Sequence, residues 1–206
     1  MSRSKSSKNW LKEHFDDPYV KQAQEAGYRS RAVFKLQEIN DKDRILKPDH
    51  NIVDLGAAPG GWSEFVRNLL PESTSIYALD ILEMEPIEGV SFIQGDFTEE
   101  TVLNELIQAL QGRKINLVLS DMAPNISGMK AIDQPKAMYL AELALDFCQK
   151  SLISNGDFLV KVFQGEGFDT YLQSLRSHFR KVVVRKPKAS RPRSREVYLL
   201  AREYRV

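Results

Sequence analysis

The chain has 206 residues, of which 42% are hydrophobic, which is about one domain's worth of sequence with enough apolar content for a single core. It has no apolar run near the roughly 20 residues of a membrane helix, no apolar secretory signal, and only one cysteine and three histidines, which excludes an internal disulfide and gives no metal-ligand cluster by spacing. The net charge of +1 conceals a basic segment at each end, and we expect a monomeric cytoplasmic protein that makes no membrane contact.

Residues 1–9 are rich in Ser and Lys and have no periodicity, so we expect them to be disordered and residues 10–206 to form one domain. The basic side chains of the N-terminal part are Arg3, Lys5, Lys8, Lys12, Lys21, Arg29 and Arg31. A single charge run is most simply a solvated face. A second basic run at the other end of the chain favours a polyanionic partner.

The first predicted helices precede the first strand. Trp10 to Ala26 has a weak helical pattern, and Gly27 breaks it. Ser30 can cap a helix from Arg31 to about Asn40, which contains Lys35. From sequence alone, Lys35 is most simply a solvated lysine.

The segment from Asn51 to Ser63 reads NIVDLGAAPGGWS. It predicts a short buried strand, a sharp turn through Gly56, Gly60 and Gly61, and a helix that begins near Trp62, which is the opening of a nucleotide-binding α/β domain. The glycines do not fit the dinucleotide fingerprint, and no Lys-Ser or Lys-Thr pair follows them as in a phosphate loop. The pattern D-L-G-A-A-P-G-G-W instead resembles the cofactor loop of S-adenosylmethionine-dependent methyltransferases.

Strands and helices then alternate with the spacing of βαβ units. We expect strands at 75–79, 90–94 and 115–120 and a helix at 101–110. Asp80 follows the second strand, about 20 residues beyond the glycines, where a ribose diol is usually held. Asp96 follows the third strand and is placed either to accept from an adenine amino group or to cap the next helix. Asp121 follows the fourth strand.

The C-terminal half continues the alternation and ends in the second basic segment. We expect a helix from Gln134 or Pro135 to about Ile153, a strand at 157–163, a helix at 168–179, and strands at 182–184 and 196–201. The segment from Thr170 to Arg195 has no acidic residue and many basic ones. The candidates for RNA contact in the two basic segments are Arg29, Arg31, Arg191, Arg193 and Arg195.

Lys161 lies in a strand that is apolar on both sides, where a charged lysine is costly unless it has a partner or faces a cavity. A structural ion pair is the simpler explanation. However, ligands of doubly wound sheets sit at the carboxyl ends of the strands, where Asp80, Asp96 and Asp121 also lie. If the last strand inserts antiparallel beside the fifth, Glu196 joins Lys161 and Asp121 at that edge.

At these positions the chain resembles a known family. Lys35, Asp121 in S-D-M-A-P-N, Lys161 in V-K-V-F-Q-G-E-G and Glu196 in S-R-E-V-Y are similar to the K-D-K-E tetrad of ribose 2′-O-methyltransferases. The likeness to the FtsJ/RrmJ family runs from about Trp10 to the last strand, and the one visible difference is P-K-A-M in place of R-A-M. It implies a Rossmann-like α/β methyltransferase fold, with a seven-stranded, mostly parallel sheet, an antiparallel last strand and helices on both faces.

The resemblance also implies an activity. The family's reaction is methyl transfer from S-adenosyl-L-methionine, without a metal, to the 2′-hydroxyl of a uridine in the A-loop of 23S rRNA, in the assembled large (50S) subunit, with S-adenosyl-L-homocysteine as product. Lys161 would be the general base that accepts the proton late, and Lys35, Asp121 and Glu196 would complete the catalytic set. Cofactor contacts would come from Gly60, Trp62, Asp80, Asp96 and Asp121.

Three alternatives remain open. A methyltransferase of base amino groups would share the glycine turn but usually has D-P-P-Y or N-P-P-Y after the fourth strand, where this chain has D-M-A-P-N. A nicotinamide dehydrogenase gives no reason for Lys161 together with Glu196. A non-catalytic RNA-binding module would keep the basic ends and tolerate the loss of Lys161.

Overall fold

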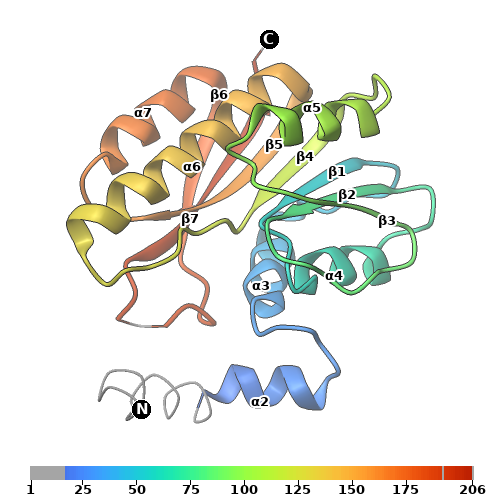
Figure 1. Cartoon of the computed structure of the whole chain (residues 1–206), viewed down its shortest axis with the longest axis horizontal. Helices are drawn as coiled ribbons and strands as arrows, with labels where there is room; N and C mark the ends of the chain where they lie inside the picture. The colour runs from blue at the N-terminus through green and yellow to red at the C-terminus, as the bar shows by residue number, and fades with distance from the viewer. Residues whose placement is uncertain (1–16, 192, 206) are drawn as a thin grey trace.

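The computed structural model describes residues 17–191 and 193–205, so the expected disorder of residues 1–9 lies outside the described residues. Its centre is one seven-stranded sheet in the order β3-β2-β1-β4-β5-β7-β6 (Figure 1). The strands are β1 (Asn51–Leu55), β2 (Ser75–Asp80), β3 (Val90–Gln94), β4 (Ile115–Ser120), β5 (Leu152–Phe163), β6 (Phe179–Arg185) and β7 (Glu196–Tyr204). The first five pair in parallel, and β7 runs antiparallel to both β5 and β6. The predicted fold class is confirmed.

Helices cover both faces of the sheet. They are α2 (Pro18–Glu25), α3 (Val33–Asp43), α4 (Gly61–Leu69), α5 (Glu100–Ala109), α6 (Lys130–Ser151) and α7 (Phe168–His178). Figure 1 shows α5, α6 and α7 on one face, α3 and α4 on the other, and α2 apart from the main body beyond α3. No helix among residues 17–191 and 193–205 is long and apolar enough to cross a membrane.

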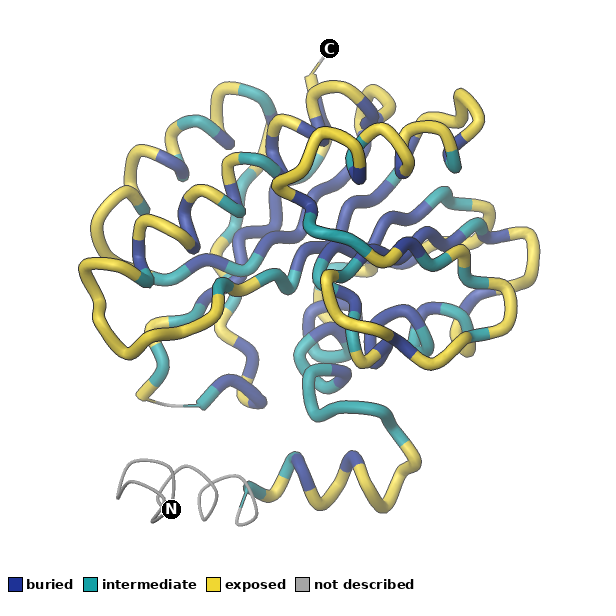
Figure 2. The backbone as a smooth tube through the Cα atoms, in the orientation of Figure 1, coloured by how far each residue is buried: buried dark blue, intermediate teal, exposed yellow. Residues whose placement is uncertain are grey.

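Two large apolar clusters, one on each face, make most of the core, a third small one lies around Ala57, Ala78 and Met84, and most residues of the central strands are buried (Figure 2). Successive residues of a strand point to opposite faces, so Val53 packs in the cluster with α5, α6 and α7, whereas Ile52 packs with α3 and α4. Leu159 of β5 and Tyr198 of β7 belong to the α3 and α4 side. A parallel sheet covered on both faces reads as apolar runs, which is why the sequence revealed these strands.

Several predicted boundaries are wrong. The N-cap of α3 is Ala32, and no side chain caps it, so Ser30 does not play that role. Helix α6 begins at Lys130, before the predicted start at Gln134 or Pro135. Asp133 accepts hydrogen bonds from the Ser127 and Gly128 N–H groups, and these bonds fix the turn that precedes the helix. Strand β5 begins at Leu152, and its pairing with β4 shifts register before Asp157, which hides the early part from a period-two pattern.

An ion pair ties the α3 layer to the end of the sheet. Arg185 of β6 donates to both carboxylate oxygens of Asp43, at 2.7 Å each, in a two-pronged contact. The Arg185 hydrogen bond, despite partial burial, lowers the pKa of Asp43 below its usual value. This contact sets α3 beside β6 and β7 and so carries Lys35 towards Glu196.

Candidate active site

The four residues predicted to act together lie at one edge of the sheet. Asp121 directly follows β4, Lys161 lies near the end of β5, Glu196 is the first residue of β7, and Lys35 is in the first turn of α3. In the antiparallel pairing of β5 with β7, Phe163 lies opposite Glu196 and Lys161 lies two residues away on the same face. The predicted insertion of the last strand beside the fifth is confirmed, and it creates this cluster.

Within the cluster, each lysine has its own carboxylate. Lys161 Nζ lies 3.0 Å from Asp121 Oδ1 and donates to the Asp121 carbonyl oxygen at 2.5 Å. Lys35 Nζ lies 2.7 Å from Glu196 Oε1, which also accepts from the Ser190 hydroxyl at 2.9 Å. The Lys161 side chain is only 8% exposed, so its charge needs this partner. Lys161 therefore forms the ion pair that was expected as its simpler role, and it also lines a pocket.

Tyr198 was missed by sequence reasoning. Its hydroxyl donates to Asp121 Oδ1 at 2.7 Å, its ring packs against Trp62, and Lys35 Nζ lies 5.6 Å from the ring centroid. Burial, followed by the charges of Asp121 and Glu196, raises the pKa of Tyr198 well above its ordinary value, so it stays a neutral donor. The only signal in the sequence was its position two residues after Glu196, on the same strand face.

Asp121 is held as a carboxylate despite its burial. Burial alone would raise its pKa, but the charges of Lys161 and Lys35 and the hydrogen bond from Tyr198 outweigh that and hold the pKa below its usual value. An acceptor that stays ionised keeps Lys161 in place across the neutral pH range.

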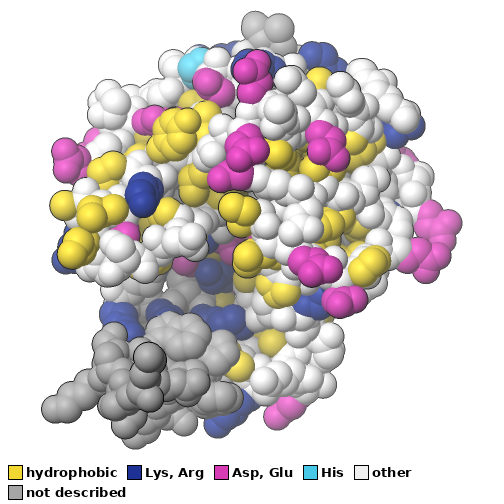
Figure 3. Space-filling model, in the orientation of Figure 1, with side chains coloured by type: hydrophobic (Ala, Val, Ile, Leu, Met, Phe, Trp, Pro, Cys, Tyr) yellow, Lys and Arg dark blue, Asp and Glu magenta, His cyan; other side chains and the backbone are white. Residues whose placement is uncertain are grey.

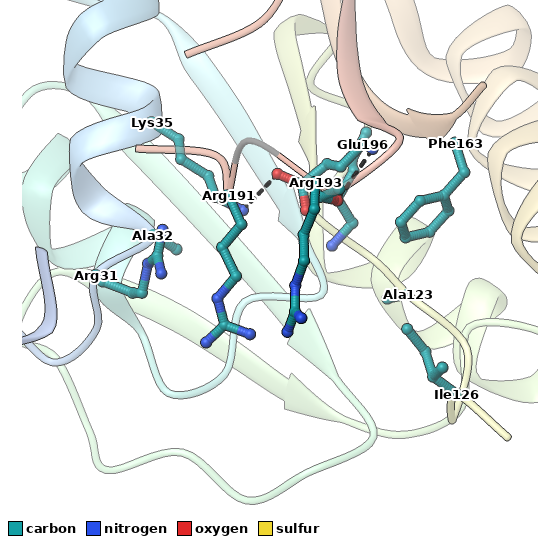
Figure 4. Close-up of a pocket in the computed structure, with 11 residues that line it drawn as sticks. Arg31, Ala32, Lys35, Ala123, Ile126, Phe163, Arg191, Arg193 and Glu196 are labelled. Carbon is teal, nitrogen blue, oxygen red and sulfur yellow. Dashed lines mark hydrogen bonds and ion pairs between the residues drawn. The ribbon is translucent and has the colours of Figure 1, made fainter. Parts of the chain in front are cut away.

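Three residues of the cluster, Lys35, Lys161 and Glu196, line a pocket of about 520 Å³ with two unlike sides. Figure 4 shows Arg31, Arg191 and Arg193 on one side, Phe163 and Ile126 on the other, and Glu196 between them. In the space-filling view, Lys and Arg side chains gather around a hollow at the lower left (Figure 3). The pocket can hold an anion beside an apolar group, as a nucleotide requires.

The remaining arginines expected to contact RNA lie elsewhere. Arg29 donates to Glu64 at 3.0 Å and to the Glu85 carbonyl at 2.7 Å, which braces the outside of the glycine turn. Arg195 donates to the Gln164 carbonyl at 3.1 Å. Of the five candidates, the pocket brings together Arg31, Arg191 and Arg193.

The glycine turn after β1 is close-packed. Gly56 has a φ of +77°, and a Cβ there would lie 2.8 Å from the backbone nitrogen of Met122. Gly60 has a φ of +104°, and a Cβ there would lie 2.9 Å from Ile87. The indole of Trp62 is buried and donates to the Ala32 carbonyl, so Trp62 can offer a ligand only its backbone. Glycine is required at both turn positions.

Two carboxylates flank this turn. Asp80 accepts from the Ala58 N–H at 2.9 Å through Oδ2 and from the Leu82 N–H at 2.8 Å through Oδ1. Asp96 accepts from the N–H and the hydroxyl of Thr98. The alternative role of Asp96 as a helix cap is wrong, because Glu99 is the N-cap of α5.

The residues around the turn fit an adenosyl group. Both carboxylates keep free lone pairs for hydroxyl or amino donors. Ile81 and Leu82, directly after Asp80, are 59% and 63% exposed, which leaves apolar surface for a flat ring beside it. Among the described residues, no three His, Cys, Asp or Glu side chains come together as a metal site.

Asp54, beneath the turn, was also missed. It is fully buried in β1, its Oδ2 accepts from the Ser63 hydroxyl at 2.7 Å, and its Oδ1 has no partner. Burial, reduced by the Ser63 hydrogen bond and reinforced by the charges of Asp121 and Asp80, raises its pKa to about 7. A carboxyl group in this position favours its protonated form below neutral pH.

We expect Asp54→Asn to stabilise the protein more at pH 8 than at pH 5. The pKa of Asp54 is higher in the folded state than in the unfolded state, so the stability of the parent falls as the pH rises from about 4 to about 7. Asparagine does not titrate, so the variant does not lose this stability. The gain of the variant over the parent should grow by roughly 3 kcal/mol between the two pH values, measured by urea unfolding. A gain that is equal at both values would mean that the Asp54 pKa is not raised.

Comparison with known proteins extends these observations. The sequence model of the family described as FtsJ-like methyltransferase matches residues 28–204. The ribosomal RNA large subunit methyltransferase E of Chromohalobacter salexigens is 61% identical over 198 residues, which are 96% of this chain and 94% of that protein. The protein of the same name from Pseudomonas aeruginosa is 58% identical over 205 residues, which are 100% of this chain and 99% of that one.

Solved structures agree. A putative ribosomal RNA methyltransferase from Plasmodium falciparum superposes with a TM-score of 0.77 at 30% identity, over 86% of this chain and 98% of that one. Fibrillarin in complex with Nop5p superposes with a TM-score of 0.58 at 16% identity, which shows a shared fold alone. The matched region includes the glycine turn, the acids at the strand ends and all four clustered residues.

Proposed function

Because this chain belongs to the FtsJ-like methyltransferase family, we propose that it methylates the ribose 2′-hydroxyl of a uridine in 23S rRNA with S-adenosyl-L-methionine as donor. The A-loop of the assembled large subunit is the proposed target, and the enzyme acts as a cytoplasmic monomer. Membership of the family removes the nicotinamide dehydrogenase as an alternative.

The observation that carries the proposal is the position of Lys161 between Asp121 and the pocket. In its neutral form, the Nζ amine has two N–H groups, and two Asp121 oxygens lie within 3.0 Å to accept them. The lone pair is then free to face the pocket. Lys161 is therefore the proposed general base that removes the proton of the attacking 2′-hydroxyl.

The other residues of the cluster position this base and the hydroxyl. Asp121 fixes the Lys161 amine, and Tyr198 fixes the Asp121 carboxylate. Lys35, paired with Glu196, brings a positive charge to the pocket, where it stabilises negative charge that develops on the ribose oxygen. A fixed arrangement of these groups saves the entropy of orienting them at each turnover.

The cofactor belongs at the glycine turn. The backbone of Gly60 and Trp62 is proposed to hold the methionine part, Asp80 the ribose and Asp96 the adenine, with Asp121 between cofactor and substrate. Bound S-adenosyl-L-methionine supplies a methyl group that its sulfonium already activates, and S-adenosyl-L-homocysteine remains. The protein's own task is then alignment, proton removal and exclusion of water.

The two unlike sides of the pocket support a nucleotide substrate. The arginine side offers donors to a sugar-phosphate backbone, and Phe163 and Ile126 offer an apolar surface to a base. RNA is preferred over DNA because only RNA carries the 2′-hydroxyl that is methylated.

We expect the protein to transfer labelled methyl groups to the ribose of rRNA. The assay compares free 23S rRNA, large subunits from cells that lack the enzyme, and DNA, and it locates the label by nuclease digestion and chromatography. Label on a 2′-oxygen, highest in large subunits and absent from DNA, is the expected result. Label on a base would contradict the proposed reaction, and bound cofactor without any transfer would favour a non-catalytic role.

A further inference from the structure

Two arginines that line the pocket contact the carboxylate of Asp17, a residue that does not itself line the pocket. Arg31 Nη1 forms an ion pair with Asp17 Oδ2, and Arg191 Nε lies 3.8 Å from the same oxygen. Arg31 also donates to the Ala189 carbonyl. The Asp17 side chain is only 8% exposed. It is thus enclosed between two cations that both line the substrate pocket.

The guanidinium groups of Arg31 and Arg191 lie close enough for their positive charges to repel each other. Burial, followed by the charge of Arg191, lowers the pKa of Arg31 below its ordinary value. An anion between the two arginines relieves their repulsion, and Asp17 supplies one negative charge on a forked oxygen pair. A phosphodiester presents the same charge on two non-bridging oxygens, and arginine binds either group through the same N–H donors.

The segment that carries Asp17 lies outside the sheet and the helices that cover it. Asp17 lies at the N-terminus of α2, which Figure 1 shows apart from the main body. Rings at the start and end of this segment, Tyr19 and Tyr28, both pack on Phe34 of α3, with centroids 5.7 Å apart in each case. The segment is thus anchored by Phe34, while the carboxylate reaches across to the arginines.

We propose that Arg31 and Arg191 form a binding site for a backbone phosphate of the RNA substrate, and that the Asp17 carboxylate occupies this site until RNA displaces it. The identity of the polyanion rests on the proposed function. Arg31 and Arg191 line the same pocket as Lys161, the proposed general base. A phosphate held by the two arginines can therefore guide the neighbouring ribose towards Lys161. Asp17 keeps the two arginines in position before RNA arrives and competes with RNA for them.

The first test is Asp17→Asn with direct measurement of RNA binding. Asparagine caps a helix as well as aspartate does and can still accept from the Tyr19 N–H, so α2 remains capped, but the negative charge is gone. The affinity for a short fluorescein-labelled RNA stem-loop should rise about three- to tenfold. Asp41→Asn, on the exposed side of α3, changes the net charge equally and should leave the affinity unchanged.

The second test combines this change with Arg191→Gln. The single Arg191→Gln variant should bind the RNA more weakly, and its salt slope should fall by roughly 0.7 to 0.9 for the lost phosphate contact. Asp17→Asn should then bring a smaller gain in RNA affinity in the Arg191→Gln background than in the parent, because Asp17 there competes with RNA for Arg31 alone. Unlabelled RNA should displace the probe, whereas inorganic phosphate at the same phosphate concentration should not.

Four results would overturn the proposal. They are weaker or unchanged RNA affinity in Asp17→Asn, an equal gain in Asp41→Asn, a full gain in the Arg191→Gln background, and displacement of the probe by inorganic phosphate at the concentration at which RNA displaces it. Because binding is measured without turnover, failure of methyl transfer in the parent protein would count against the proposed function and leave the phosphate site to be judged by these variants alone.

Discussion

Replacing Lys161 with alanine is expected to reduce kcat for methyl transfer by about 100-fold or more, while the affinity for S-adenosyl-L-methionine stays within about threefold of the parent. The change removes the proposed proton acceptor and leaves the glycine turn and the acids beside it intact. Single-turnover transfer of labelled methyl and equilibrium titration with the cofactor measure the two effects separately.

Lys161→Arg is the matched control. Arginine can keep the ion pair with Asp121 but cannot lose a proton in a protein, so it separates a structural ion pair from a base. We expect Lys161→Arg to fold like the parent and to be as inactive as the alanine variant. Activity close to the parent's in the arginine variant would show that Lys161 acts as a fixed charge, and collapse of cofactor binding in both variants would show that it is structural.

The strands that position the site could be predicted because a glycine or an acidic residue marks the end of their apolar runs. Strands β3 and β4 have their predicted boundaries, since Gly95 and Asp121 follow them directly and both mark the point where the chain leaves the sheet. The early part of β5 could not be found in this way, because Ser154, Asn155 and Gly156 interrupt the apolar pattern. The chain bulges at these residues, where the register with β4 shifts and Asn155 has a φ of +62°, so no regular strand pattern covers them.

The strand order was enough to predict which residues of the site lie near one another, but not which of them form contacts. Lys161 and Glu196 are 35 positions apart, and only the antiparallel insertion of β7 beside β5 brings them to one edge. Which lysine would pair with which acid was beyond the sequence, because that depends on how close α3 lies to β7. Tyr198 and Asp17 act through contacts with distant segments, and neither has a local pattern that distinguishes it from a core tyrosine or a helix cap.

Asp80→Ala should weaken binding of S-adenosyl-L-methionine by about 10- to 100-fold and leave kcat at saturating cofactor within a few-fold of the parent. The carboxylate is proposed to hold the cofactor ribose, and it also accepts from the Ala58 N–H, so the variant loses both the ligand contact and a restraint on the glycine turn. Isothermal titration with S-adenosyl-L-homocysteine measures the loss. Glu83→Ala, which removes an exposed carboxylate three residues further on, is the matched control and should bind normally.

An analogue without the ribose hydroxyls separates the two effects of Asp80. If Asp80 binds the diol, the analogue should bind the parent weakly, and Asp80→Ala should weaken it much less than it weakens S-adenosyl-L-homocysteine. If Asp80 only restrains the turn through Ala58, the substitution should weaken both ligands by the same factor. Equal affinity of the parent and Asp80→Ala for S-adenosyl-L-homocysteine would remove Asp80 from the cofactor site altogether, and the acid at the end of β2 would then serve the fold of the loop alone.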